Sequence, residues 1–269
     1  MNINKERKST VVGKLDIIDN FLMPQFHDGR SRTIRVWMPK SYDKDSTKTY
    51  PVIYMHDGQN LFDNKTAYLV EWEVDETITL LINEGVIDGA IVVGIDNSAR
   101  RINEYLGYDA TYENVFYDAE GDAYGKFIVE TLKPFIDSNY RTKTSKEHTF
   151  ISGSSMGGVI SFYLGLKYPN VFSKIGAFST AFELFPKQQR EQFYNSVNFN
   201  NLTETKLYLD ISTREPGWDE INVVKSELLD KGFNKDNLHI LINSCHNHDE
   251  IAWRERLPFG LMWLFGINK

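Results

Sequence analysis

The stretch that decides the fold is "ISGSSMGGVISFYLG", residues 151–165. Apolar residues precede its glycines and serines in "HTFI", and a longer apolar run, "VISFYLGLKY", follows them. A surface linker is not usually bracketed by apolar segments on both sides. The pattern therefore predicts a buried strand, a sharp turn at residues 153–157 and a helix.

Short apolar segments recur on both sides of this stretch and are typical of strands buried on both faces. They are "VIYM" (52–55), "GAIVVGI" (89–95), "HTFI" (148–151), "KIGAFS" (174–179), "KLYLDIS" (206–212) and "LHILI" (238–242). Helical stretches such as 71–85 and 124–140 lie between them, and the earlier segments 10–19 and 32–38 alternate in polarity. This alternation predicts an α/β fold with a mainly parallel sheet, antiparallel N-terminal strands and helices on both faces.

Length and charge limit the classes of protein that the chain can belong to. Its 269 residues are enough for one large α/β domain, and we expect a single domain over 1–269. With 30 basic and 37 acidic residues, the net charge of -7 disfavours binding to nucleic acid or to an anionic membrane. We therefore expect a small-molecule partner, and the sequence leaves the oligomeric state open.

Cysteine content and the chain ends indicate a soluble cytoplasmic protein. The single cysteine, Cys245, cannot form an internal disulfide. The N-terminal "MNINKERKST" is charged and has no apolar stretch behind it, so it does not resemble a secretory signal. The apolar stretch 257–267 is about half as long as a membrane-spanning helix needs to be.

The turn after residue 152 fits the pattern G-x-S-x-G, with Gly153, Ser155 and Gly157 at its fixed positions. In this strand-to-helix context the pattern is a nucleophile elbow, in which a strained backbone makes the central serine hydroxyl project from the sheet. Small neighbours leave room for that conformation. Ser155 would also lie at a helix N-terminus, whose free N–H groups stabilise negative charge.

A serine nucleophile needs a base and an acid that orients the base, and on this scaffold the acid precedes the histidine. Glu215 follows the predicted strand 206–212 and is the preferred acid; Asp210 and Asp219 are alternatives. Two histidines, His246 and His248, follow the last predicted strand, and composition does not separate them.

Stabilisation of an oxyanion requires two backbone N–H groups near the nucleophile. Met156 follows Ser155 directly and supplies the first. The second would come from the loop after an early strand, where "MHDGQNLFD" contains a glycine that lets the backbone approach closely. We expect the N–H of Gln59 to be that donor.

Six motifs together resemble the esterase D-type family of the α/β-hydrolase superfamily, from about Arg32 to Leu264. They are "YPVIYMHDGQNLFD", "VVGIDN" with "RINEY", "YGKFIVETLKPFIDSNYRT", "GSSMGG", "LDISTRE" and "HDEIAWRERLP". The resemblance implies a triad of Ser155, Glu215 and His248, the last within a pattern H-x-E-x-x-W.

The "RINEY" element lies near the active site in proteins that this chain resembles. Arg101, Glu104 and Tyr105 could therefore form an ion pair that supports a loop, or part of the pocket wall, and Trp218 is a further candidate for the wall.

These observations predict a serine esterase that forms an acyl-enzyme and needs no metal or other cofactor. The resemblance implies the candidate substrates, which are small acyl esters, sugar esters and siderophore lactones. Two alternatives remain: a metal-dependent hydrolase that uses His246 and His248 in "HNHDE", and a non-catalytic binding protein with the same fold.

Overall fold

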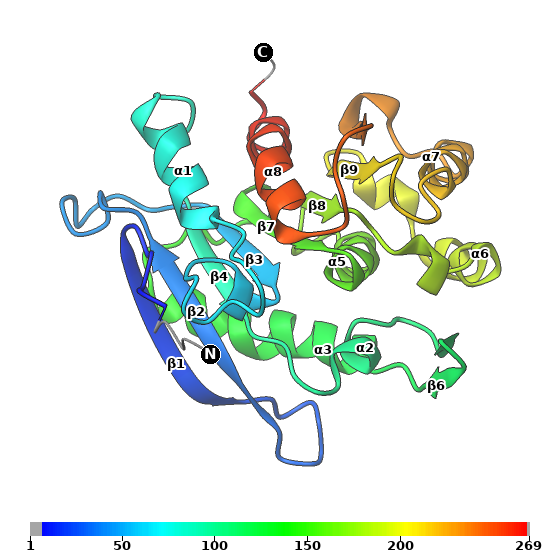
Figure 1. The fold of residues 1–269 in the computed structure, drawn as a ribbon, viewed down its shortest axis with the longest axis horizontal. Helices are drawn as coiled ribbons and strands as arrows, with labels where there is room; N and C mark the ends of the chain where they lie inside the picture. Colours follow the sequence, from blue (N-terminus) through cyan, green and yellow to red (C-terminus); the bar gives the residue numbers. More distant parts are fainter. Residues whose placement is uncertain (1–6, 268–269) are drawn as a thin grey trace, which may run out of the picture.

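The computed structural model describes residues 7–267 and contains an eight-stranded sheet and a separate two-stranded hairpin. The strands are β1 (Lys14–Leu22), β2 (Ser31–Met38), β3 (Val52–His56), β4 (Ile91–Ile95), β5 (Ala110–Tyr112), β6 (Val115–Tyr117), β7 (Thr149–Ser154), β8 (Lys174–Phe178), β9 (Lys206–Ser212) and β10 (Leu238–Asn243). The large sheet has the order β1-β2-β4-β3-β7-β8-β9-β10 (Figure 1). Strand β2 pairs antiparallel with β1 and β4, and the strands from β4 to β10 are parallel, which confirms the predicted α/β architecture.

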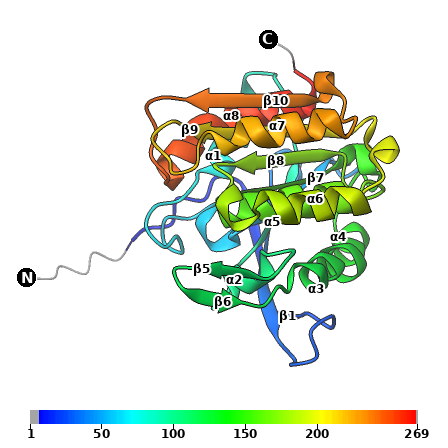
Figure 2. The same ribbon diagram turned by 90° about the vertical axis from the view of Figure 1, so that its right-hand side faces the viewer.

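Helices cover both faces of this sheet. They are α1 (Val74–Asn83), α2 (Arg101–Glu104), α3 (Gly121–Lys126), α4 (Lys133–Asn139), α5 (Met156–Lys167), α6 (Lys187–Ser196), α7 (Glu220–Asp230) and α8 (Glu250–Phe265). Figure 2 shows α5, α6 and α7 in front of the strands, with α1 and α8 behind them. Short 3₁₀ turns lie at Gly58–Asn60, Lys146–His148, Phe182–Leu184, Phe199–Leu202 and Lys235–Asn237. Within residues 7–267, no helix is both long and apolar enough to cross a membrane.

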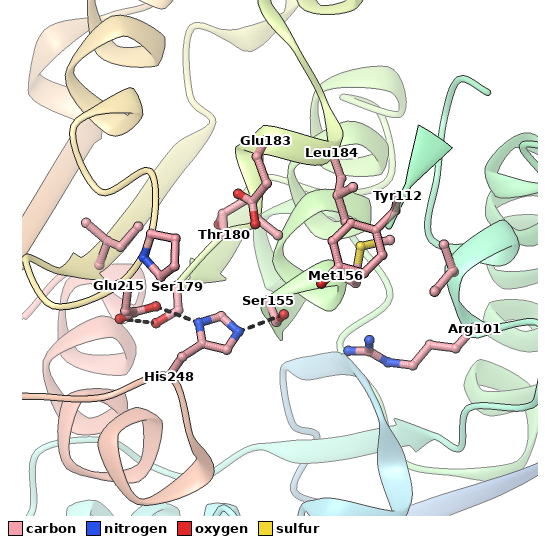
Figure 3. A pocket seen from close by; sticks show the side chains of 14 residues that line it. Arg101, Tyr112, Ser155, Met156, Ser179, Thr180, Glu183, Leu184, Glu215 and His248 are labelled. Atoms are coloured by element: carbon pink, nitrogen blue, oxygen red, sulfur yellow. Dashed lines mark hydrogen bonds and ion pairs between the residues drawn. The ribbon is translucent and has the colours of Figure 1, made fainter. Parts of the chain in front are cut away.

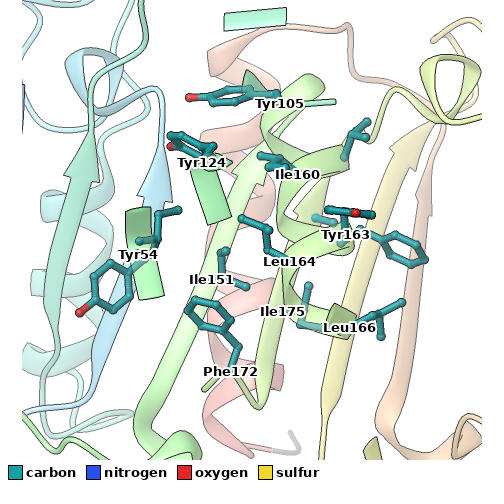
Figure 4. Packing of buried hydrophobic residues seen from close by; sticks show 14 of the residues in the cluster. Tyr54, Tyr105, Tyr124, Ile151, Ile160, Tyr163, Leu164, Leu166, Phe172 and Ile175 are labelled. Carbon is teal, nitrogen blue, oxygen red and sulfur yellow. The ribbon is translucent and has the colours of Figure 1, made fainter. Parts of the chain in front are cut away.

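Successive residues of each central strand point to opposite faces, so both faces need apolar side chains. In β7, Ile151 packs into the larger core cluster, on the side of α5, and its neighbour Phe150 packs into the cluster beside α1 and α8. Figure 4 shows the first cluster, in which Ile151 and Ile175 lie against Leu164 of α5. Each large apolar side chain buried in this way contributes about 1.5–3 kcal/mol to folding, which explains why these segments read as continuous apolar runs.

Some elements differ from the sequence-based expectations. Strand β10 is half-buried rather than buried on both faces, because it is an edge strand that pairs only with β9. The helix expected over 124–140 extends from α3 to α4 and includes a π-helical segment, Phe127–Leu132. The β5–β6 hairpin was not expected, because its three-residue strands are too short to show a period.

The topology brings distant parts of the sequence to one edge of the sheet. The loop after β3, the turn after β7 and the turn after β9 all follow the carboxyl ends of parallel strands. The loop from β10 to α8 begins at the same edge. Functional groups of open α/β sheets collect at this edge.

Candidate active site

Ser155 lies in the sharp turn between β7 and α5, and its backbone is strained. Its φ of 57° and ψ of -122° belong to a region that residues with a side chain rarely adopt. The Ser155 N–H donates to the carbonyl of Phe178 at 2.9 Å, which ties the turn to the end of β8. As predicted, the sequence here folds as strand, tight turn and helix.

Two glycines make this turn sterically possible. A Cβ on Gly153 would lie 2.6 Å from the carbonyl oxygen of Gly157, so any larger residue would force the turn open. A Cβ on Gly157 would lie 3.3 Å from Oδ2 of Asp57, where α5 packs against the end of β3. The glycines therefore allow the close approach on which the position of Ser155 depends.

The structure brings together the three side chains expected to form a triad (Figure 3). Oγ of Ser155 lies 2.9 Å from Nε2 of His248, and Nδ1 of His248 lies 2.6 Å from Oε2 of Glu215. An ionised carboxylate can only accept hydrogen bonds. Nδ1 of His248 therefore carries a proton and donates a hydrogen bond to Glu215. Nε2 is then free to accept a hydrogen bond from the Ser155 hydroxyl, which is the arrangement that a general base requires.

Several donors surround the Glu215 carboxylate. Its Oε1 accepts hydrogen bonds from Oγ of Ser179 and from the N–H of Ser212, both at 2.9 Å. Burial acts to raise the pKa of Glu215, but the hydrogen bonds from His248, Ser179 and Ser212 outweigh it and lower the pKa. Glu215 therefore stays ionised at neutral pH, although its side chain is only 2% exposed.

Arg256 of α8 links this carboxylate to Asp210. Its guanidinium lies 3.2 Å from Asp210 and 3.5 Å from Glu215 as ion pairs, and it donates a hydrogen bond to Oγ of Ser179. Sequence analysis missed Ser179 and Arg256. The only sequence signal for Ser179 is its place directly after the apolar strand β8, and Arg256 has no signal in its local pattern.

The alternative acids and the alternative histidine have other partners. Asp210 accepts from the N–H of Ser179 and from the Tyr208 hydroxyl, and burial raises its pKa to about 6. Asp219 precedes α7 as its N-cap residue but makes no side-chain cap hydrogen bond. Nε2 of His246 lies 2.8 Å from Glu255.

The histidines of "HNHDE" thus face different partners rather than a common point. Within the described chain, no group of three or more His, Cys, Asp or Glu side chains is arranged to hold a metal ion. Trp253, four residues into α8, stands edge-on to the His248 ring, with the ring centroids 5.2 Å apart. This contact restricts the orientation of the His248 ring.

The two expected oxyanion donors lie beside Ser155. Met156 is the first residue of α5, and Gln59 lies in the 3₁₀ turn that follows β3. Among the loop and turn hydrogen bonds of residues 7–267, none is donated by the backbone N–H of either residue. Met156 is at the first position of α5, where an N–H has no acceptor within the helix, and we expect both N–H groups to face a substrate oxygen.

Asp57 holds the loop that carries Gln59. It adopts a left-handed backbone with φ of 59°, and its carboxylate accepts two hydrogen bonds from Arg101, at 2.7 and 2.8 Å. Asn97 donates a hydrogen bond to this carboxylate at 2.6 Å. The backbone N–H of Asp57 donates to the hydroxyl of Tyr105 at 3.2 Å. Burial opposes ionisation of Asp57, but Arg101 outweighs it and lowers the pKa.

The candidates for the pocket wall differ in their positions. Arg101 lines the site, whereas Tyr105 is fully buried beneath the Asp57 loop. Glu104 is also buried, and it forms an ion pair with Arg32 at 2.6 Å. Trp218 is 37% exposed and lines neither of the cavities at Ser155. The "RINEY" element therefore supports the loop, and only Arg101 of these four residues reaches the cavity.

Two cavities meet at Ser155, His248 and Arg101. One, of about 370 Å³, lies beside the β5–β6 hairpin and the turn after β8, and its lining includes Tyr112, Glu183 and Leu184 (Figure 3). The other, of about 310 Å³, lies between the Gln59 loop and the start of α8. A substrate can therefore extend from Ser155 in two directions.

Similar curated proteins cover between about half and nine-tenths of this chain. YbbA of Bacillus subtilis strain 168, an uncharacterized protein, is 24% identical over 258 residues, which are 90% of this chain and 96% of YbbA. The endo-1,4-beta-xylanase/feruloyl esterase of Xylanibacter ruminicola is 27% identical over 157 residues, or 56% of this chain, but only 20% of that longer protein is matched.

Solved structures show the same fold. The BES protein from Bacillus cereus superposes with a TM-score of 0.72 at 20% identity, over 98% of this chain and 99% of that one. A ferulic acid esterase has a TM-score of 0.71 at 19% identity, over 97% of this chain and 100% of that one.

The family model described as "Putative esterase" matches residues 27–264, which confirms the resemblance seen in the six motifs. The chain therefore belongs to this esterase family of the α/β-hydrolase fold and is a carboxylic ester hydrolase.

Proposed function

We propose that the protein hydrolyses carboxylic esters by transferring the acyl group first to Ser155 and then to water. The observation that carries this proposal is the continuous chain of hydrogen bonds from Ser155 through His248 to Glu215, with distances of 2.9 and 2.6 Å. A non-catalytic binding protein would have no need for this alignment on a strained turn.

The reaction begins with attack of Ser155 Oγ on the ester carbonyl carbon, while Nε2 of His248 takes the hydroxyl proton. The carbonyl oxygen becomes an oxyanion, to which the N–H groups of Gln59 and Met156 donate. His248 then gives its proton to the departing alcohol oxygen. Water, deprotonated by the same nitrogen, attacks the acyl-enzyme and releases the acid.

Glu215 keeps Nδ1 of His248 protonated and stabilises the imidazolium that forms in each step. Its lowered pKa keeps it negatively charged when His248 becomes positive. All proton transfers thus take place on this chain's own side chains, without a metal or other cofactor.

Compact esters fit the cavities best. Spaces of about 370 and 310 Å³ accommodate a small acyl group and a ring-sized alcohol. Proteins similar to this chain include an acetyl esterase, feruloyl esterases and enterobactin esterases. We infer a small acyl ester, sugar ester or siderophore lactone, in preference to a long-chain lipid ester.

The proposal is tested by measuring kcat for Ser155→Ala and Ser154→Ala on p-nitrophenyl acetate. The matched control removes a neighbouring hydroxyl that is buried at the end of β7. We expect the first change to lower kcat by about 10⁴-fold or more and the second by less than about tenfold. Comparable turnover in both variants would rule out Ser155 as the nucleophile.

A further inference from the structure

The charged residues that line the two cavities are mostly acidic. The cavity of about 370 Å³ is lined by Glu183 and Glu215, and the cavity of about 310 Å³ by Asp57 and Glu250. Arg101 lines both cavities. Two of the four carboxylates have cationic partners in the described chain: Asp57 pairs with Arg101, and Glu215 pairs with Arg256. The remaining two, Glu183 and Glu250, determine the electrostatic character that a substrate meets.

Glu183 lies in the 3₁₀ turn after β8 and forms no ion pair with the residues described. Figure 3 shows its side chain extending from this turn into the cavity that also contains Ser155 and His248. The pKa of Glu183 is raised above its ordinary value, chiefly by burial and to a smaller extent by the Glu215 charge, against the lowering effect of its own backbone N–H and His248. Its carboxylate is thus close enough to the catalytic groups to interact with them.

A second unpaired polar group lines the same cavity. Thr180 is 3% exposed, and its Oγ1 has no hydrogen-bond partner among residues 7–267. This oxygen is enclosed against Gly158 of α5, so a ligand in the cavity does not reach it. Of these two polar groups, the exposed Glu183 carboxylate is therefore the one that a ligand in this cavity can contact.

The second cavity does not compensate with positive charge. Glu250 lies at the start of α8, where its Oε1 accepts a hydrogen bond from the Asn60 amide at 3.3 Å and its carboxylate forms no ion pair with residues 7–267. Arg101 is the basic side chain on both linings, and Nε and one terminal nitrogen of its guanidinium donate to Asp57. An anionic substrate would therefore meet an unpaired carboxylate in either cavity.

We propose that Glu183 is a specificity-determining residue that selects esters bearing hydrogen-bond donors without negative charge and rejects anionic esters. This inference rests on the proposed function at Ser155. A carboxylate accepts hydrogen bonds from hydroxyl or amine groups, and in a partly desolvated cavity it repels another carboxylate. Within the proposed substrate range it favours hydroxyl-bearing esters over multiply charged ones.

The test compares matched neutral and anionic esters in two series. In the alcohol series, the phenolic acetate of p-hydroxybenzyl alcohol is neutral, whereas the acetate of p-hydroxybenzoate carries a negative charge on its leaving group. In the acyl series, p-nitrophenyl butyrate is neutral, whereas p-nitrophenyl hemisuccinate carries the negative charge on its acyl group. The ratio of kcat/KM between neutral and anionic esters is measured for the wild type, Glu183→Gln and Glu84→Gln. The last variant removes the same charge at the exposed end of α1, outside both cavities.

We expect the wild type to prefer the neutral ester by about tenfold in at least one series, a value typical of one nearby, partly screened charge. Glu183→Gln should abolish most of that preference by raising kcat/KM for the anionic ester, and Glu84→Gln should preserve it. If the ratio in Glu183→Gln equals that of the wild type in both series, the inference is wrong.

The same experiment separates this failure from failure of the proposed function. Should Ser155→Ala retain turnover of the neutral esters, the proposed nucleophile is wrong whatever the ratios show. Should Ser155→Ala be inactive while the ratios stay unchanged in Glu183→Gln, only the role of Glu183 is excluded.

Discussion

Oγ of Ser179 donates a hydrogen bond to Oε1 of Glu215 at 2.9 Å, while the other carboxylate oxygen of Glu215 accepts from His248 at 2.6 Å. Ser179 directly follows β8 and has a positive φ of 41°. Its N–H donates to Oδ1 of Asp210 in the neighbouring strand β9. The ends of two parallel strands thus fix the carboxylate that we propose orients His248.

Removing this hydroxyl should therefore affect catalysis more than binding. We expect Ser179→Ala to lower kcat by about tenfold with little change in KM, because Glu215 loses one of its neutral donors but keeps the Ser212 N–H. Ser173→Ala, which also removes a buried hydroxyl and its hydrogen bond, is the matched control far from the site. Equal kcat values for the two variants would show that Ser179 does not position Glu215.

The pair of Arg101 and Asp57 should support the Gln59 loop. Arg101→Met leaves the Asp57 carboxylate buried without its cation, which should cost roughly 3 kcal/mol of unfolding free energy. We expect kcat to fall by about tenfold or more as the loop loosens, and Arg101→Lys to restore only part of it, because lysine cannot donate in the bidentate geometry.

Arg100→Met is the control for this prediction, since the neighbouring Arg100 pairs with Glu120 and Asp118 at the surface. Kinetics and urea unfolding of the three variants measure both effects. An Arg101→Met enzyme with wild-type kcat would mean that the Gln59 N–H does not depend on this ion pair.

The two late histidines should differ strongly in their effect on activity. His248→Ala removes the proposed base, which contacts Ser155, and should lower kcat by at least about a thousandfold. His246→Ala removes only the contact with Glu255 and should cost less than about tenfold. Kinetics on one activated ester, with circular dichroism to check folding, decide between them; the reverse ranking would transfer the role of base to His246.

Much of this arrangement could be predicted from the sequence. The alternation of apolar runs with helical stretches predicted the sheet, and the glycines around Ser155 predicted the turn, because both depend on local sterics and burial. The position of Glu215 beyond β9 also followed from the strand pattern. Local patterns were sufficient wherever a residue's role depends on its place at a strand end.

The supporting residues could not be predicted in the same way. Arg256 lies inside α8, and its contacts with Asp210 and Glu215 depend on how that helix packs against β8 and β9. Likewise, nothing local to Glu183 shows that it lacks a cationic partner in the part of the chain that the structure describes. Long-range contacts decide which charges are paired, and a single sequence does not specify them.

The stability of the protein should depend on pH through Asp75, which is fully buried at the start of α1. Burial, with a further contribution from the neighbouring Glu76, raises the pKa of Asp75 from 3.8 to about 9. At pH values between 3.8 and about 9, Asp75 is therefore protonated in the folded state and ionised in the unfolded state. The corresponding stability is fully present below pH 3.8 and is lost as pH rises towards about 9.

We expect Asp75→Asn, which cannot ionise, to weaken this dependence by up to about 1.4 kcal/mol per pH unit over that window. The control is Asp88→Asn, a change at an exposed carboxylate. Tm is measured between pH 6 and 9 for both variants. A slope in Asp75→Asn as steep as that of the wild type would show that Asp75 is ionised in the folded protein.

The central claim is that Ser155 forms the covalent acyl-enzyme, and labelling with a fluorophosphonate followed by peptide mapping tests it most directly. The reagent phosphonylates a serine that is activated by a base, so the account predicts one label per chain, located on Ser155. It further predicts that labelling is lost in Ser155→Ala and greatly slowed in His248→Ala. Absence of labelling in the folded wild type, or a label on Ser154 or another residue, would contradict the account.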